Sequence, residues 1–262
     1  MRSNSKDRGA QIRRLVVEMS HRSHSGETGS SLSISDLLAV LYFKTLRIDP
    51  KKPNDPKRDR FILSKGHGAA ALYAVLALRG FFPQKLLLEH RVNGGVFHGH
   101  PSRGAAPGIE VSTGSLGHGL SIGVGMAYAL KETKSKIYVL IGDGECNEGS
   151  IWEAVLSAGA LRLPNIVAIV DENKFQGFGA AKEYSPFDMA KQWSSFGWET
   201  LHVDGHDVRA IEKAFEKAAK AKKPFVVFAD TISGKGVPAI EKTLSAHYYV
   251  PDAEAVAAMK KV

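Results

Sequence analysis

Residues 137–149, IYVLIGDGECNEG, indicate the fold of this chain most directly. The segment begins with five consecutive apolar residues, which is typical of a β-strand buried on both faces of a sheet. Gly142-Asp143-Gly144 follows where the strand ends, and a helical stretch is expected over residues 151–163. Buried strands that alternate with helices indicate a parallel sheet with right-handed crossovers. Ligands of such sheets bind at the carboxyl ends of the strands.

The same alternation continues along the chain. Further buried strands are expected at residues 166–170, 198–203 and 225–229. Helices are expected near residues 12–19, 35–46 (capped by Ser35-Asp36), 69–78 (ended by Gly80) and 119–134, then from about Ser185-Pro186, from Asp207 and over 252–261. We therefore expect one α/β domain over 1–262. It should have a helical N-terminal third and a mostly parallel sheet of about five or six strands, with helices on both faces.

Composition and charge exclude several classes of protein. The 262 residues are 44% hydrophobic and 24% charged, which is ordinary for a globular protein. The longest apolar run, residues 69–78, is half of the ~20 residues that span a bilayer, so no membrane association is expected. The net charge of +8 is spread out and lacks a nucleic-acid-binding motif, so nucleic acid is not an expected partner. The unpaired Cys146 and a polar N-terminus without a signal-peptide core predict a cytoplasmic location.

A second polar residue follows the next strand along the chain. Asn173 lies 30 residues after Asp143, one strand–helix–strand unit later. Neighbouring parallel strands are about 4.8 Å apart, so the two side chains can reach the same ion. Mg²⁺ is usually held by one or two carboxylates and phosphate oxygens, and glycines let backbone N–H groups approach a phosphate. Gly-Asp-Gly alone is a common turn, and Asn173 alone can cap one. Together, at this spacing, they predict a magnesium–diphosphate site.

Further motifs occur in a fixed order along the chain. They are RFILSKGHG (60–68), GHP (99–101), STGSLGHG (112–119), GDGECNEGSIW (142–152) and GKG (234–236) followed by His247. With Gly142-Asp143-Gly144 and Asn173 separated by 28 residues, the set resembles the thiamine diphosphate fingerprint. The sequence resembles the N-terminal, diphosphate-binding half of transketolase from about Leu15 to His247.

The resemblance implies which residues bind the cofactor and its metal. The implied metal ligands are Asp143, Asn173 and the carbonyl of Phe175. The other implied cofactor contacts are Gly142, Gly144 and Glu145 near the diphosphate, Gly114, Ser115 and Leu116 in a loop along the pyrimidine ring, and His67 and His247.

The resemblance also implies catalytic roles. His67 and His247 resemble histidines that touch the diphosphate or the substrate hydroxyls, and His100 resembles one that lines the substrate channel. Imidazoles donate, accept and move protons near neutral pH, which suits a sugar substrate. Glu148 resembles an acid that links two active sites of a dimer. Four other histidines are expected to be structural: His21, His90, His202 and His206.

One stretch departs from the family pattern. The family commonly carries Gly-His-Pro-Gly-Gly before Ser-Leu-Ser, whereas residues 26–33 here read GETGSSLS. Glu27 therefore stands where a substrate-facing histidine is common. A carboxylate repels an acidic or phosphorylated donor and attracts a hydroxyl-rich or amine-bearing one. His24, three residues earlier, is expected to substitute only partly for the missing imidazole, and only if the loop shifts; the alternative is that Glu27 faces solvent.

The resemblance implies transfer of a two-carbon ketol unit from a ketose to an aldose, with thiamine diphosphate and Mg²⁺ as cofactors. The resemblance implies a second domain of about 150 residues that holds the pyrimidine ring and supplies an activating Glu, and we expect a partner polypeptide to carry it. We therefore expect an α₂β₂ assembly with a partner subunit, in contact around residues 119–129 and 148–152. Three alternatives remain. One is a related thiamine diphosphate enzyme subunit with another donor, either a specialised ketol or acyl transferase of secondary metabolism or a 2-oxoacid decarboxylase or dehydrogenase component. The others are a non-catalytic scaffold subunit and a nucleic-acid-binding protein.

Overall fold

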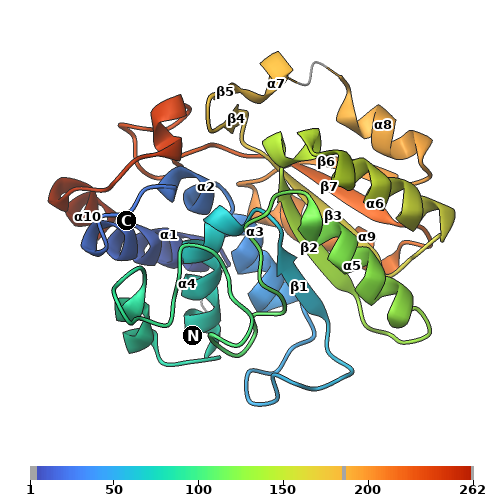
Figure 1. Cartoon of the computed structure of the whole chain (residues 1–262), viewed down its shortest axis with the longest axis horizontal. Coiled ribbons are helices and arrows are strands. Elements are labelled where there is room, and N and C mark those ends of the chain that lie inside the picture. Colours follow the sequence, from blue (N-terminus) through green and yellow to red (C-terminus); the bar gives the residue numbers. More distant parts are fainter. Residues whose placement is uncertain (1–4, 185–186, 261–262) are drawn as a thin grey trace.

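Five parallel strands form the centre of the molecule (Figure 1). The computed structural model describes residues 5–184 and 187–260. The strand order is β1-β2-β3-β7-β6, and every neighbouring pair is parallel, which confirms the predicted sheet. The strands are β1 (Arg60–Leu63), β2 (Ile137–Gly142), β3 (Ile166–Glu172), β6 (Glu199–Asp204) and β7 (Phe225–Asp230). Because β2, β3 and β7 are neighbours, the residues that follow them meet at one edge.

Alternate residues of β1, β2, β3 and β7 face two separate apolar cores. In β2, Tyr138 and Leu140 belong to one core, whereas Ile137, Val139 and Ile141 belong to the other. The first core is covered by α1 (Ser5–Arg22), α3 (Ser35–Val40), α4 (Ala69–Arg79) and α9 (Val208–Lys220), and the second by α5 (His118–Ala129), α6 (Gly149–Ala160) and α8 (Met189–Ser195). Both faces of the sheet are therefore covered by helices, as predicted.

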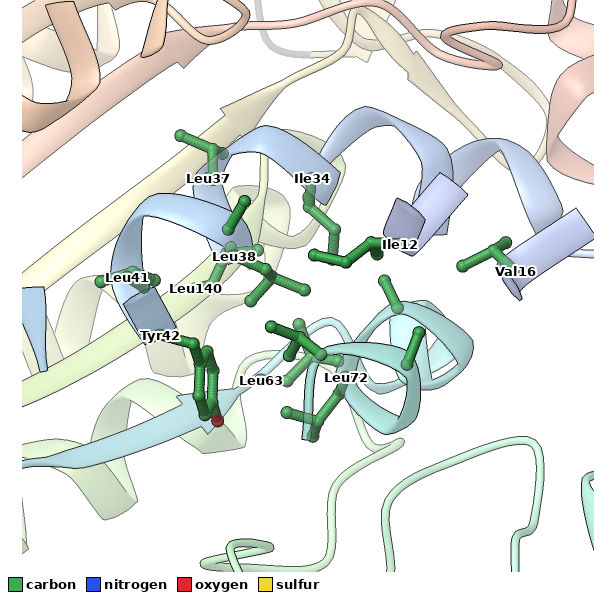
Figure 2. Packing of buried hydrophobic residues seen from close by; sticks show 14 of the residues in the cluster. Ile12, Val16, Ile34, Leu37, Leu38, Leu41, Tyr42, Leu63, Leu72 and Leu140 are labelled. Carbon is green, nitrogen blue, oxygen red and sulfur yellow. The ribbon is translucent and has the colours of Figure 1, made fainter. Parts of the chain in front are cut away.

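The N-terminal helices α1 and α3 pack around α4, on the face of the sheet that belongs to the first core. Figure 2 shows Ile12 of α1 beside Ile34, the residue before α3, with Leu72 of α4 and Leu63 of β1 below this pair in the view. Ile12 and Val16 have no exposed surface, and burying such a side chain contributes about 1.5–3 kcal/mol. This packing accounts for the predicted helical N-terminal third.

The remaining elements are short. They are α2 (Thr28–Ser33), the π-helix η1 (Leu41–Thr45), the 3₁₀-helices η2 (Gly66–Gly68), η3 (Gln84–Glu89), η4 (Gly144–Asn147) and η5 (Leu244–His247), the hairpin β4 (Phe175–Gln176) and β5 (Gly179–Ala180), α7 (Ala181–Tyr184) and α10 (Ala253–Met259). Among the described residues, no helix has the length and apolarity that crossing a bilayer requires.

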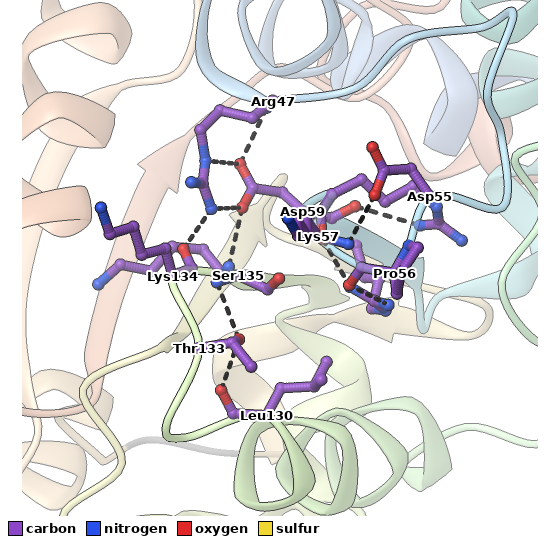
Figure 3. Close-up of polar contacts among 12 residues, drawn as sticks. Arg47, Asp55, Pro56, Lys57, Asp59, Leu130, Thr133, Lys134 and Ser135 are labelled. Atoms are coloured by element: carbon purple, nitrogen blue, oxygen red, sulfur yellow. Dashed lines mark hydrogen bonds and ion pairs between the residues drawn. The ribbon is translucent and has the colours of Figure 1, made fainter.

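Asp59 links the amino ends of β1 and β2, opposite the edge where ligands are expected, and forms an ion pair with Arg47 (Figure 3). The guanidinium of Arg47 contacts both carboxylate oxygens of Asp59, the residue before β1. Asp59 Oδ1 also accepts a hydrogen bond of 2.8 Å from the N–H of Lys136, the residue before β2. These contacts fix how the first two strands are aligned.

Several boundaries differ from the prediction. β1 was not expected, because four residues that begin with Arg60 carry little strand signal. Ser35 and Asp36 do not cap a helix: Ser35 Oγ donates to the Ser31 carbonyl, and Asp36 pairs with Arg13 and His206. The helix predicted over 35–46 is α3 followed by a π-helix, and α5 ends at residue 129 rather than 134. The start predicted at Ser185-Pro186 lies outside the described residues, and α8 begins at 189.

Candidate active site

A cavity of about 640 Å³ lies where β2 and β3 end. It is lined by nearly all of the residues singled out from the sequence: Glu27, His67, His100, Gly114, Leu116, Gly142, Asp143, Gly144, Glu145, Glu148, Asn173, Phe175 and His247. Segments from many parts of the chain therefore meet at one place, as the crevice rule for parallel sheets predicts. Two predicted residues do not belong to the lining. Ser115 is exposed beside two lining residues, and His24 is exposed at the turn after α1.

Asp143 is a buried carboxylate at the end of β2, with only 5% of its surface exposed. Its two oxygens accept hydrogen bonds of 2.8 Å from the N–H groups of Gly144 and Lys174. Lys174 adopts a left-handed conformation (φ 75°), which turns the chain back toward Asp143 directly after β3. Burial, and next the negative charge of Asp171, raise the pKa of Asp143 to about 7. The site thus holds a negative charge that its surroundings compensate incompletely.

Asn173 is held by hydrogen bonds on both sides of its amide. Its Nδ2 donates to Asp171 Oδ2 at 3.0 Å, and its Oδ1 accepts from the N–H of Phe175 at 3.0 Å. Lys65 also binds Asp171, with its Nζ 2.6 Å from Oδ2, and both members of this ion pair are almost completely buried. Asp171 has a lowered pKa: burial raises it, but Lys65 and the hydrogen bonds to this carboxylate outweigh that effect.

Glu145 joins three segments around the cavity. Its Oε1 accepts from the hydroxyl of Ser64 and from the N–H of Gly117, at 2.9 Å for the latter, and its Oε2 accepts from the N–H of Gly142 at 3.1 Å. The end of β1, the start of α5 and the end of β2 are therefore tied to one carboxylate. Although Glu145 lines the cavity, its oxygens are already engaged by the protein.

Three histidines face the cavity from different segments. The rings of His67, in η2, and His247, in η5, are 5.7 Å apart. Burial, and next the positive charge of Lys65, lower the pKa of His67 to about 3. The same two causes lower the pKa of His247, and the charge of Glu27 opposes them. Both imidazoles are therefore neutral at neutral pH and have one ring nitrogen able to accept a proton.

Glycines allow the loops at the cavity to approach one another. A Cβ at Gly66 would lie 2.8 Å from the nitrogen of Gly114, so the turn after β1 packs directly on the loop before α5. Gly114 has a φ of 145°, and a Cβ there would lie 3.2 Å from the ring of His100. These close contacts place His100 against the predicted pyrimidine loop.

Glu27 lies in the cavity wall and has a partner that the sequence did not indicate. Its Oε2 accepts a hydrogen bond of 2.6 Å from Arg91 Nη2, and both side chains are 28% exposed. Glu27 and Arg91 both have positive φ angles, of 64° and 51°. Such conformations are uncommon outside glycine and often occur at functional sites. The guanidinium also lies against Gly99, where a Cβ would collide with it.

Sequence reasoning missed several other lining residues. They are Ser30, Lys65, Asn147, Gln176, Gly177, Phe178 and Tyr184. Lys65 had a detectable signal, because it lies inside the motif at 60–68. The residues at 176–184 had none, because they approach the site only through the β4–β5 hairpin and α7.

The cavity's residues fit a magnesium–diphosphate group. No group of three or more His, Cys, Asp and Glu side chains suited to a metal occurs among residues 5–184 and 187–260. A metal here would therefore need amide, carbonyl and phosphate oxygens besides Asp143, and Mg²⁺ accepts such ligands. The raised pKa of Asp143 also indicates a carboxylate that a cation would stabilise.

Residues 5–262 match the family described as the thiamine diphosphate binding domain of transketolase. The chain belongs to the transketolase family. Among solved structures, transketolase from Leishmania mexicana matches it with a TM-score of 0.95 and 28% identity, over 99% of this chain and 41% of that one. The sheet and its helices are therefore those of a transketolase thiamine diphosphate-binding domain.

Curated relatives include chains named as transketolase subunits. The 6-deoxy-6-sulfo-D-fructose transketolase subunit SqwG of Clostridium sp. (strain MSTE9) is 43% identical over 240 residues, which cover 90% of this chain and 87% of that one. An apulose-4-phosphate transketolase subunit of Phocaeicola vulgatus is 42% identical over 246 residues, covering 92% and 87%. The transketolase of Mus musculus is 40% identical over 240 residues, but this chain covers only 38% of its length.

Proposed function

We propose that this chain is the N-terminal, diphosphate-binding subunit of a two-chain transketolase that moves a two-carbon ketol unit from a ketose to an aldose. The observation that carries the proposal is the meeting of Asp143, Asn173 and three histidines in one cavity at the ends of neighbouring strands. Relatives of similar length that are named as transketolase subunits support the two-chain arrangement.

In this proposal the chain anchors the cofactor through Mg²⁺. Asp143, the side-chain oxygen of Asn173 and the carbonyl of Phe175 hold the metal, and backbone groups near Gly142 and Gly144 face the diphosphate. When bound, thiamine diphosphate supplies the nucleophilic carbon that accepts and releases the ketol unit. The protein's role is to orient the cofactor and to neutralise the charge of its diphosphate.

The histidines handle protons and hydroxyls around the substrate. Neutral His67 and His247 are suited to accept a proton from a substrate hydroxyl, and the lowered pKa of each favours that neutral form. His100 lines the same cavity beside Gly114 and is proposed to orient the substrate. Glu148 is exposed at the cavity edge in the single chain, which supports a role between two active sites of an assembly.

The partner subunit is proposed to supply the pyrimidine pocket and the activating glutamate, in an α₂β₂ assembly. Exposed apolar side chains on neighbouring helices support a buried contact there: Ile122 and Tyr128 of α5 are 37% and 50% exposed, and Leu156 of α6 is 54% exposed. A reducing, cytoplasmic location forms part of the proposal and is supported by the single, free Cys146.

Glu27 is proposed to influence the choice of donor. The ion pair with Arg91 occupies Oε2, whereas no described residue donates a hydrogen bond to Oε1. Arg91 compensates the charge of Glu27, which weakens the expected repulsion of an anionic donor and leaves a hydrogen-bond acceptor in the wall. This arrangement favours a hydroxyl-bearing part of the substrate at Glu27.

The test is ketol transfer by this chain purified together with its partner, an α/β protein of roughly 300 residues. We expect transfer from at least one ketose or ketose phosphate, and none from the chain alone. D143A should lose Mg²⁺-dependent cofactor binding at least 100-fold. D204A, which removes an exposed carboxylate at the end of β6 outside the cavity, should stay within twofold of wild type.

Two results would overturn the proposal: an assembly that binds no cofactor, or full turnover by the isolated chain. A scaffold protein would show no Mg²⁺-dependent cofactor affinity. The role of Glu27 is tested separately by E27H, which should change the relative rates with free and phosphorylated donors. An unchanged donor profile would remove that role and leave the rest intact.

A further inference from the structure

One carboxylate below the cavity collects four side-chain donors from four different segments. Asp171, the last residue but one of β3, has no exposed surface. Its Oδ2 accepts hydrogen bonds from Lys65 Nζ at 2.6 Å, Ser33 Oγ at 2.8 Å and Asn173 Nδ2 at 3.0 Å. Its Oδ1 accepts from the hydroxyl of Thr231, which follows β7. Lys65 lies in the turn after β1, Ser33 in α2, and Asn173 directly after β3.

Asp171 also contacts the segment that carries Asp143. The backbone carbonyl of Asp171 accepts a hydrogen bond of 3.2 Å from the N–H of Asp143. In the strand register, Asp171 lies opposite Gly142 on one side and Ala229 on the other. One residue therefore touches both proposed metal ligands, Asp143 through its backbone and Asn173 through its side chain.

Stability alone does not explain a charged pair at this depth. Lys65 and Asp171 are 1% and 0% exposed, and a buried ion pair often contributes no more than well-packed apolar residues of the same volume. The five preceding residues of β3, at 166–170, are all apolar and buried, so an apolar residue at 171 would continue that pattern. The hydrogen-bonded polar residues begin at Asp171, where β3 reaches the cavity.

The chemistry of the network determines how the amide of Asn173 is oriented. An ionised carboxylate only accepts hydrogen bonds, so the amide nitrogen of Asn173 must face Asp171. The N–H of Phe175 only donates, so the amide oxygen must face that side. Both contacts select the same orientation, in which Oδ1 is kept on the side away from Asp171 with one further lone pair to offer.

We propose that Asp171 is a positioning residue for the metal site: it holds the amide of Asn173 so that its oxygen is presented to Mg²⁺. Lys65, Ser33 and Thr231 hold Asp171 in place. The inference rests on the proposed function, because it takes Asn173 as a metal ligand. Partners that orient a ligand in this way typically change metal affinity 10- to 100-fold when they are removed.

The experiment measures Mg²⁺ dependence rather than turnover. In the purified two-chain assembly, the Mg²⁺ concentration that gives half-maximal binding is determined by calorimetry with two probes, thiamine diphosphate and inorganic pyrophosphate. We expect D171L, which removes both acceptor oxygens and so no longer dictates the orientation of the Asn173 amide, to raise this concentration at least tenfold. The matched control is S33A, which removes another donor to the same carboxylate without touching Asn173, and it should raise the concentration less than threefold.

A double-mutant cycle distinguishes positioning from general damage. If Asp171 acts through Asn173, D171L should raise the Mg²⁺ requirement of N173A less than twofold, because the amide to be oriented is already gone. A purely structural role predicts the same tenfold effect in both backgrounds, and that result would overturn the inference. Unfolding of the metal-free assembly, followed by circular dichroism, verifies that each variant is folded.

The outcomes separate this inference from the proposed function. If the Mg²⁺ requirement shifts through Asn173 but no donor supports ketol transfer, the positioning role stands and the transketolase activity falls. If transfer occurs and D171L leaves the Mg²⁺ requirement unchanged, the activity stands and the positioning role falls. If neither probe binds in a Mg²⁺-dependent manner, both are refuted.

Discussion

Replacing Asp143 by asparagine should stabilise the metal-free chain at pH 8 and abolish the proposed metal site. The carboxylate is 5% exposed, and burial together with the nearby charge of Asp171 raises its pKa to about 7. In the unfolded chain the pKa is near 3.9. Above pH 7, folding therefore forces an ionised group into an environment that favours its neutral form, and this costs stability.

The magnitude follows from the two pKa values. A difference of about three pH units, at about 1.4 kcal/mol each, makes the ionised Asp143 cost about 4 kcal/mol at pH 8. Asparagine avoids this cost, but its oxygen accepts only one of the two hydrogen bonds from Gly144 and Lys174 and its amide nitrogen faces the other N–H, a loss of about 1–3 kcal/mol. The expected net gain is about 1–3 kcal/mol, or a rise in Tm of about 2–10 °C for a chain of this size.

The size of the stabilisation by D143N depends on pH. The folded pKa is raised, so the penalty is fully present above pH 7 and fades as the pH falls toward 4. At pH 5 the remaining penalty of about 1–2 kcal/mol is offset by the lost hydrogen bond, and D143N should melt within about 5 °C of wild type.

The assay is thermal unfolding by circular dichroism, in a chelator, at pH 5 and pH 8. D204N serves as the control, because it alters an exposed carboxylate at the end of β6. We expect its Tm to follow wild type at both pH values. A D143N variant that melts lower than wild type at pH 8 would refute the idea that Asp143 carries an uncompensated charge. Added Mg²⁺ and thiamine diphosphate should raise the Tm of the wild-type chain but not that of D143N.

Two further predictions concern packing and protonation. In α5, G119A should lower the free energy of unfolding by about 1–3 kcal/mol, because its Cβ would lie 2.4 Å from Ser64 Oγ. The control is G125A, whose Cβ meets nothing within 4 Å and which should stabilise the chain by up to about 1 kcal/mol. Equal denaturation midpoints of the two variants would contradict this prediction. His67 should stay neutral down to about pH 4 in NMR titrations, since its pKa is about 3. Because the unfolded side chain binds its proton near pH 6.5, H67N should gain stability relative to wild type as the pH falls from 6.5 to 4, and a folded-state midpoint near 6.5 would disprove the assignment.

The alternation of strands and helices could be predicted from the sequence, because it depends on local patterns of apolar residues. Continuous apolar runs such as 137–141 mark strands covered on both faces, and the helices between them follow from spacing. The positions of Asp143 and Asn173 were predictable as well, since both directly follow such runs and neighbouring parallel strands end at one edge. The short β1, the end of α5 and the true partners of Asp36 were not, because tertiary contacts override weak local signals there.

The sequence alone thus determined the parallel sheet, the edge that carries the site and the residue types at that edge. Only the tertiary structure decided which charges meet. Lys65 lies 106 residues from Asp171, and Glu27 lies 64 residues from Arg91. No local pattern encodes such a pair, since it forms only when helices, strands and loops pack and exclude the water that would otherwise solvate each charge separately.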